Sequence, residues 1–160
     1  MDIRVARPDE FAPLGRLTLD AYRTVGEWSP EYEAELLDVA HRAEHATVLV
    51  AADDDGTLLG CLTVVPPGPN VLSEHREPGA GSIRMLAVDE VARGRGVGEA
   101  LTRAAIDAVR AEGAEAIVLH SATTMTSAHR LYRRLGFERD EAFDWEPEPG
   151  VTLLGFRLSL

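Results

Sequence analysis

The sequence has 160 residues, 45% of them hydrophobic and 27% charged, which predicts one globular domain spanning residues 1–160. Its formal net charge of −11 excludes nucleic acid as the main partner, because phosphate binding requires a basic surface. No apolar run approaches the roughly 20 residues that cross a bilayer, so we expect no membrane segment. The one cysteine, Cys61, excludes an internal disulfide framework, so we expect a reducing, cytoplasmic environment.

Hydrophobic spacing and turn residues predict a strand, two helices and a hairpin in the N-terminal half. The second helix has a favourable start, because Ser29 can cap it and Pro30 fits its first turn. A Pro/Gly-rich loop follows the hairpin, and loops of this length are usually functional or mobile. The predicted segments are a strand at 3–5, helices at 8–21 and 30–40, strands at 47–52 and 57–65, and the loop at 66–80.

Strands and helices alternate through the C-terminal half. They are a strand at 82–88, an amphipathic helix at 97–109, a strand at 115–120, a helix at 126–135, and strands at 137–144 and 151–158 around a loop at 146–150. This order implies an α/β (α+β) fold, with one mixed sheet and helices on its faces. We expect a mostly antiparallel sheet of about six to seven strands, flanked by about four helices.

A glycine-rich segment joins the predicted strand at 82–88 to the next helix, and it reads Arg93-Gly94-Arg95-Gly96-Val97-Gly98. The first backbone N–H groups of a helix have no partners, and the helix dipole favours negative charge there. Glycines let the backbone approach a ligand closely, and consecutive exposed N–H groups form an anion-binding nest. The two arginines add charge-assisted donors, so a pyrophosphate is the expected ligand.

Several interpretations of this loop compete. A Walker-type phosphate loop is excluded, because it requires a lysine and the chain has none. A Rossmann dinucleotide loop is weakened, because its spacing needs a glycine where Glu99 stands and because the loop follows a hairpin in mid-chain. A plain glycine-rich turn before a helix and a coenzyme-A site both remain.

The surroundings of the loop contain two longer motifs. The first begins with Met85-Leu-Ala-Val-Asp89 and continues through Arg93-Gly-Arg-Gly-Val-Gly-Glu-Ala-Leu101, and the second is Ala128-His-Arg-Leu-Tyr-Arg-Arg-Leu-Gly-Phe137. Together they closely resemble the signatures of the GCN5-related N-acetyltransferase (GNAT) family, the second of which is A-x-x-L-Y-x-x-x-G-F. The separation of the motifs and the predicted order of elements also fit, so the resemblance covers nearly the whole chain.

The resemblance implies a single GNAT domain that transfers an acetyl group from acetyl-CoA to a primary amine of a small molecule or peptide, in a ternary complex. It also implies that the strand before the loop splays from its neighbour and opens a V-shaped cleft for the pantetheine arm. Leu86, Ala87 and Val88 would offer backbone groups to this arm, and an N–H near Leu86 or Ala87 would stabilise the oxyanion. The residues that would hold the pyrophosphate are Arg93, Gly94, Arg95, Gly96, Val97 and Gly98.

Catalytic roles are expected for two side chains. Tyr132 occupies the tyrosine position of the second motif, and a phenol with a pKa of about 10 can protonate a leaving thiolate. The alternative for Tyr132 is a core aromatic residue. Residues 82–88 contain no carboxylate base, so His120 at the end of the following strand is the candidate base. A structural role for His120 and water relays to more distant carboxylates stay open.

Two further features bear on binding. Met125 stands where many relatives have asparagine, and a thioether cannot make the amide's hydrogen bond to pantetheine, although Thr124 or Thr126 could substitute. The first two helices, the loop at 66–80 and the loop before the last strand should form the acceptor wall. The aromatic side chains expected there are Tyr22, Trp28, Tyr32, Phe143 and Trp145.

We expect no metal, because the histidines share no convincing metal-ligand spacing; those considered are His41, His45, His75 and His129. A homodimer stays open, as does the identity of the acceptor amine. Two other functions also stay open. One is a non-catalytic CoA-binding or sensing module, which the missing carboxylate and Met125 favour, and the other is transfer of a longer acyl group.

Overall fold

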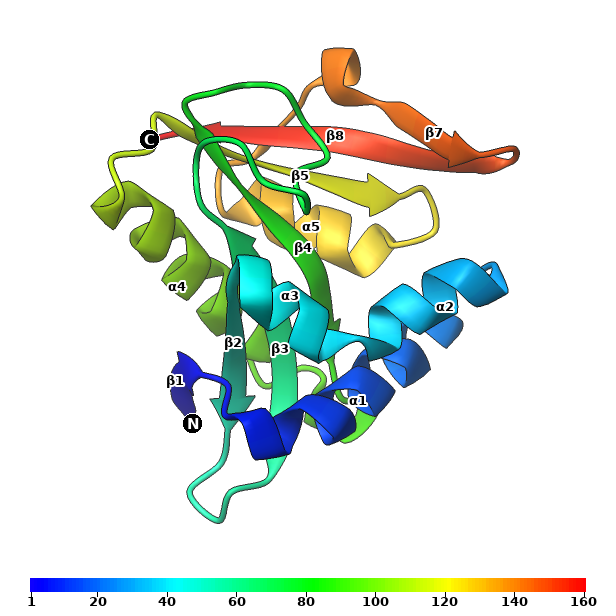
Figure 1. The fold of residues 1–160 in the computed structure, drawn as a ribbon, viewed down its shortest axis with the longest axis vertical. Helices are drawn as coiled ribbons and strands as arrows, with labels where there is room; N and C mark the ends of the chain where they lie inside the picture. Colours follow the sequence, from blue (N-terminus) through cyan, green and yellow to red (C-terminus); the bar gives the residue numbers. More distant parts are fainter.

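The computed structural model describes residues 1–160 as one eight-stranded sheet with five α-helices (Figure 1). The strands lie in the order β1-β2-β3-β4-β5-β8-β6, and β7 pairs with β8. Every pair is antiparallel except β4 with β5. This mixed, mostly antiparallel architecture confirms the predicted fold class.

The strands are β1 (Asp2–Val5), β2 (Thr47–Ala52), β3 (Leu58–Val65), β4 (Ala80–Val88), β5 (Ala116–Ala122), β6 (Glu138–Arg139), β7 (Trp145–Glu148) and β8 (Val151–Ser159). The α-helices are α1 (Phe11–Arg23), α2 (Pro30–Leu37), α3 (Val39–His45), α4 (Val97–Ala111) and α5 (Thr126–Arg134). Three short 3₁₀ turns, at Pro8–Glu10, Glu90–Ala92 and Glu141–Phe143, connect them.

Different helices cover the two faces of the sheet. On one face, Val48 and Val50 of β2 pack with Leu14 of α1 and with α3. On the other face, Leu49 of β2 joins the larger core, to which α4 contributes Leu101 and α5 contributes aromatic and apolar side chains. This division follows from the two-residue repeat of a strand, which sends successive side chains to opposite faces. No helix of the chain has both the length and the apolar character needed to cross a bilayer.

The helix predicted over residues 30–40 is broken at Asp38 into α2 and α3. Asp38 has φ −88° and ψ 68°, which ends the first helix. Its carboxylate accepts the backbone N–H of His41 at 3.1 Å and so caps the second helix. The prediction of one continuous helix is therefore wrong, because a capping side chain competes with the helical backbone at this position.

Arg42 of α3 holds the end of α2 against the sheet. Its side chain is buried, and its Nη1 donates to the carbonyl oxygen of Glu35 at 2.6 Å. Nη2 reaches the carbonyl of Leu36 at 3.3 Å, and Nε donates to Oγ1 of Thr63 on β3 at 3.1 Å. The guanidinium thus satisfies carbonyls that a helix C-terminus leaves unpaired, where the helix dipole also favours positive charge.

The strand predicted over residues 137–144 forms only at Glu138–Arg139. Asp140 then caps a 3₁₀ turn by accepting the Ala142 N–H at 3.1 Å, and Asp144 accepts the Gly155 N–H at 2.7 Å. These side chains replace the strand pairing with local hydrogen bonds. The predicted loop at 146–150 is also wrong, because β7 and β8 form a hairpin there that turns at Gly150, which has φ +85°.

The hydrogen bonds of Arg42 lead to a stability prediction. We expect Arg42→Ala to lower the free energy of unfolding by about 3 kcal/mol, because it leaves buried carbonyls unpaired. The exposed Arg16 of α1 makes no ion pair or hydrogen bond, so Arg16→Ala should change stability by no more than about 0.5 kcal/mol. Urea unfolding of both variants checks this. Equal losses would show that Arg42 does not hold α2.

Candidate active site

The neighbouring strands β4 and β5 separate along their length. Their parallel pairing begins at Ala80↔Ala116 and ends at Ile83↔Leu119, although both strands continue. Beyond this point β4 stays paired with β3, and β5 stays paired with β8 as far as Ala122. The edges that face each other are therefore left without a strand partner, which opens a gap in the sheet.

An irregular backbone conformation at Met85 accompanies the separation. Met85 has φ +56° and is the one non-glycine residue with a positive φ. The register of β3 against β4 shifts at the same place, between Cys61 and Thr63. A bulge of this kind bends a strand and changes its twist. The conformation is also costly for a residue with a side chain, and such strain concentrates at functional sites.

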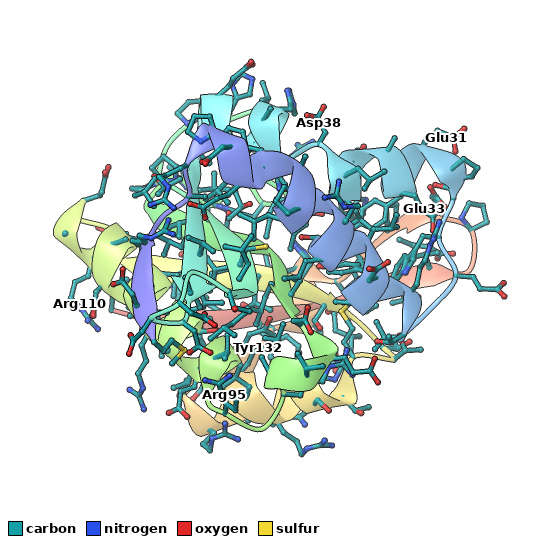
Figure 2. All side chains as sticks on the ribbon, turned by 90° about the horizontal axis from the view of Figure 1, so that it is seen from below. Glu31, Glu33, Asp38, Arg95, Arg110 and Tyr132 are labelled. Atoms are coloured by element: carbon teal, nitrogen blue, oxygen red, sulfur yellow. The ribbon has the colours of Figure 1, made fainter.

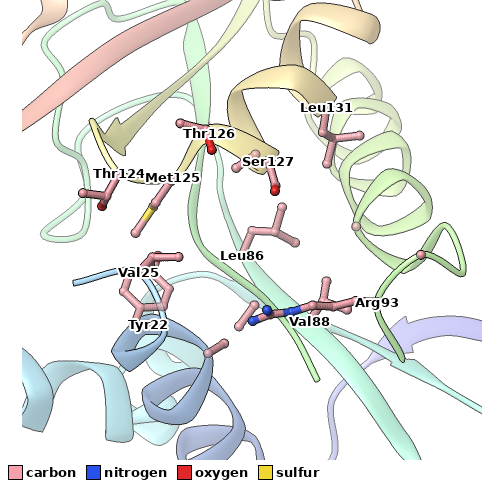
Figure 3. A pocket seen from close by; sticks show the side chains of 15 residues that line it. Tyr22, Val25, Leu86, Val88, Arg93, Thr124, Met125, Thr126, Ser127 and Leu131 are labelled. Atoms are coloured by element: carbon pink, nitrogen blue, oxygen red, sulfur yellow. The ribbon is translucent and has the colours of Figure 1, made fainter. Parts of the chain in front are cut away.

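A cavity of about 410 Å³, here called the interstrand cavity, occupies the gap (Figure 3). Its walls are formed by Ala21 and Tyr22 of α1, Val25 just after this helix, Leu86–Val88 of β4, Arg93, Gly94 and Gly98 of the glycine loop and α4, and Thr124–Ala128 and Leu131 at α5. Leu86, Ala87 and Val88 thus lie where the resemblance places them. Figure 3 shows Tyr22 and Met125 at one end of the cavity and Arg93 beside Val88 at the other.

The glycine loop carries a row of free donors, and its residues Gly94 and Gly98 border this cavity. No backbone N–H from Gly94 to Glu99 donates a hydrogen bond within the chain, and α4 begins without a side-chain cap. Gly94 and Gly96 have φ values of +80° and +79°, which glycine adopts without strain. Such a row at the start of a 15-residue helix matches the requirements of an anion site.

The remaining loop residues play different parts. Arg93 borders the interstrand cavity and donates to Oγ1 of Thr24 at 3.2 Å. Arg95 does not border the cavity and pairs with Asp53 at 3.0 Å, where both side chains are partly exposed. The Val97 side chain is buried in the core, so only its backbone N–H is free. The structure therefore brings Arg93, but not the side chain of Arg95, to the cavity.

Tyr132 lies within the molecule, beside Phe137 and Phe156, with ring centroids 5.7 and 5.9 Å away (Figure 2). Its neighbour Leu131 lines the interstrand cavity, but Tyr132 itself does not. The hydroxyl makes no hydrogen bond within the chain. Burial raises the pKa of the Tyr132 phenol, so this group stays protonated. The core-packing interpretation therefore holds for the ring, while the hydroxyl has no structural partner.

His120 lies at a second, smaller cavity of about 30 Å³, here called the narrow cavity, which is bordered by Tyr22, Arg84, Met85, His120 and Met125, among others. Nε2 of His120 lies 2.6 Å from the carbonyl oxygen of Phe143. A carbonyl only accepts, so Nε2 carries the hydrogen and Nδ1 is left as the acceptor nitrogen. Glu74 also borders this cavity.

A third cavity of about 290 Å³, the aromatic cavity, opens beyond the narrow one. Its aromatic walls are Trp28, Tyr32 and Trp145, and its carboxylates are Glu31, Glu35, Glu74 and Glu148. The three cavities share residues in sequence: Tyr22 and Met125 border the interstrand and narrow cavities, and Trp28 and Tyr32 border the narrow and aromatic ones. Glu74 escaped the sequence analysis, because a single residue of the loop at 66–80 belongs to no motif.

One histidine group differs from expectation. His41, Glu44 and His45 of α3 are exposed, and their ligand atoms lie within 4.8 Å of one another. Histidines four residues apart on a helix share one face, so the expectation that these residues lack a metal-ligand spacing is wrong. None of the three borders the cavities described above.

Comparison with known sequences supports one family. The sequence model of the acetyltransferase (GNAT) family matches residues 12–137. An uncharacterized N-acetyltransferase of Schizosaccharomyces pombe is 32% identical over 115 residues, which cover 72% of this chain and 66% of that protein. The chain spans less than a third of the length of several other curated relatives.

Two solved structures share the fold and more than a quarter of the aligned sequence. A GCN5-related N-acetyltransferase from Kribbella flavida is 26% identical with a TM-score of 0.74, covering 99% of this chain and 97% of that one. A GNAT acetyltransferase from Brucella melitensis, in complex with acetyl-CoA, is 27% identical with a TM-score of 0.68, covering 99% and 87%. Since the family match spans most of the sequence, the chain belongs to the GNAT acetyltransferase family.

Proposed function

We propose that this chain is an N-acetyltransferase that moves an acetyl group from acetyl-CoA to a primary amine of a small molecule or peptide. The observation that carries the proposal is the row of unpartnered N–H groups from Gly94 to Glu99, at the end of a cavity between separated strands. Family membership and the acetyl-CoA complex of the Brucella relative support the donor. The buried free thiol of Cys61 suits a reducing cytoplasm.

The residues present fit coenzyme A. The free N–H groups and Arg93 offer donors to a pyrophosphate, and the unpaired edge of β4 at Leu86–Val88 offers backbone groups to the pantetheine arm. Met125 lies at the end of the cavity nearest Tyr22 and supplies no amide there. The nearby Thr124 and Thr126 border the same cavity and can supply hydroxyl groups.

Acetyl-CoA supplies an activated thioester as the donor substrate. The neutral amine nitrogen forms a C–N bond to the acetyl carbon, the C–S bond breaks, and the amine loses the proton that the departing sulfur gains. His120 is our candidate for accepting the amine proton, through Nδ1, because it borders the narrow cavity between the donor and acceptor sides. Tyr132 is our candidate for supplying the proton to sulfur, through its unpartnered hydroxyl.

Gly98 provides a test of the cofactor site. A Cβ at this position would lie 3.3 Å from Cδ2 of Leu131, across the interstrand cavity, and the residue has no positive φ that would strain a side chain. We expect Gly98→Val to fold but to bind acetyl-CoA at least about tenfold more weakly, measured by calorimetry. Ala100→Val, in the same turn of α4 but outside the cavity lining, is the matched control and should bind normally. Unchanged binding by Gly98→Val would contradict the site.

The Tyr132 hydroxyl can be tested separately from its ring. Because this hydroxyl has no hydrogen-bond partner, Tyr132→Phe should keep the unfolding free energy within about 0.5 kcal/mol. If the phenol protonates the thiolate, thiol release should slow by roughly ten- to ten-thousand-fold at saturating substrate. A discontinuous assay of released thiol measures the rate, and thermal unfolding of the same sample measures the change in stability. A wild-type rate in this variant removes Tyr132 from the mechanism.

The pH profile offers a further check on Tyr132. Burial raises the pKa of this phenol above its ordinary value of about 10, and an acid works only while it holds its proton. Activity that depends on Tyr132 is therefore lost only as pH rises through the raised pKa. We expect kcat not to fall between about pH 7 and about pH 10. An alkaline fall within this window that disappears in Tyr132→Phe would contradict the raised pKa of this phenol.

A further inference from the structure

The aromatic cavity adjoins the acyl-transfer site that we propose. The narrow cavity joins it to the interstrand cavity through shared walls, with Tyr22 and Met125 on one side and Trp28 and Tyr32 on the other. An acceptor in the aromatic cavity would therefore extend its reactive end toward Met85 and Leu86. The chemistry of this cavity then decides which amines can bind.

The cavity offers aromatic surfaces that hold a fixed arrangement. The rings of Trp28 and Tyr32 are 5.4 Å apart, and Trp28 is locked by its Nε1 donating to the carbonyl of Tyr22 at 2.9 Å. Trp145 on β7 borders the same cavity and is 45% exposed. Burial and the carboxylates of Glu74 and Glu35 raise the pKa of Tyr32 to about 12, so its ring stays neutral. Such rings attract cations and aliphatic chains.

The charges in the cavity favour a cation and disfavour an anion. Its single arginine, Arg84, lies with Nε 2.9 Å from Oε1 of Glu74, although this N–H points away from the carboxylate and makes no hydrogen bond. Arg84 and Glu74 cancel in charge, so the remaining carboxylates, Glu31, Glu35 and Glu148, give the cavity a net negative charge. This charge disfavours a carboxylate on the acceptor.

Two carboxylates in the same cavity have no cationic partner in the chain. Glu31 and Glu35 are one turn apart on α2, where like charges destabilise a helix slightly, and neither forms an ion pair. The third carboxylate of this helix, Glu33, points to α1 and is bound by Arg23 at 2.7 Å. The chain thus pairs the carboxylate of Glu33 and leaves Glu31 and Glu35, which are exposed and border the cavity, without an ion pair.

The hydroxyl of Tyr22 has no partner in the chain where the cavities meet. The residue is only 9% exposed, but its hydroxyl makes no hydrogen bond within the chain and is not fully enclosed. It borders both the interstrand and the narrow cavity. A hydroxyl at this junction can accept from or donate to an amine nitrogen that approaches the thioester.

We propose that the acceptor is an aliphatic diamine or polyamine. One amine lies beside Tyr22 and is acetylated, and a second, protonated amine lies among Trp28, Tyr32 and Trp145 beside the carboxylates of Glu31 and Glu35. This assignment rests on the acetyl transfer proposed above and adds the substrate class. It also separates the chain from enzymes that acetylate amino acids, because the cavity repels rather than binds a distal carboxylate.

The test uses three acceptors of equal length that differ in one terminal group: 1,5-diaminopentane, 5-amino-1-pentanol and 5-aminopentanoate. With acetyl-CoA saturating, we expect kcat/KM for the diamine to exceed that of the amino alcohol by about tenfold, mainly through KM, and the amino acid to be the poorest. Calorimetric binding of the same three compounds, without turnover, should give the same order. Equal values for the diamine and the amino alcohol in both measurements would overturn the proposal.

Matched variants of α2 distinguish an effect of the carboxylates in the aromatic cavity from an effect of the protein's overall charge. The double variant E31Q/E35Q should bring the ratio of diamine to amino alcohol to within about twofold of one, whereas E33Q, whose carboxylate lies outside the cavity, should leave it unchanged. Selective diamine binding without thiol release would uphold the acceptor site and reject the transfer reaction. Thiol release at equal rates with the diamine and the amino alcohol would uphold the transfer reaction and reject the acceptor site. A ratio that E31Q/E35Q leaves unchanged would also reject the acceptor site.

Discussion

The separation of β4 from β5 is the constraint on which the rest of the molecule depends. Pairing stops at Ile83↔Leu119, and each strand then keeps only its outer neighbour. Unpaired backbone in the middle of a sheet is costly, so such an opening persists only where other contacts hold it. Here the strained conformation of Met85 turns β4 away, and β8 holds β5 along its full length. Helices from both faces then reach the same gap.

Several polar groups without a partner in the chain lie at the glycine loop and along the three cavities. They include the N–H groups from Gly94 to Glu99, the hydroxyl of Tyr22 and the carboxylates of Glu31 and Glu35. Folded proteins pair nearly all such groups when they are buried, and even exposed charges are usually balanced nearby. Other charges near the surface are balanced, as the pairs Arg95–Asp53 and Arg157–Glu77 illustrate. The unpartnered groups along the cavities are therefore available to a ligand.

The sequence predicted local features well and long-range ones poorly. The glycine loop and α4 depend on nearby residues, so their spacing was sufficient to place them. The break at Asp38 depends partly on Arg42 bonding across to Thr63, which no local pattern reveals. The cavity walls escaped for the same reason, because Tyr22, Glu74 and Trp145 are distant in sequence and meet only in the folded chain. Hydrophobic periodicity indicates which residues are buried in the core. The proposed acceptor site is instead lined by residues outside the larger core.

The hydroxyl of Ser29 has a consequence for how acceptors are selected. It accepts the N–H of Tyr32 at 3.1 Å as the cap of α2, and it donates to Glu148 at 2.8 Å, 119 residues away on β7. Residues of both elements border the aromatic cavity, so this hydrogen bond links two parts of its wall. This link is present before any ligand binds. Selection among acceptor amines then depends on the existing width of the cavity, and little binding energy is lost in closing it.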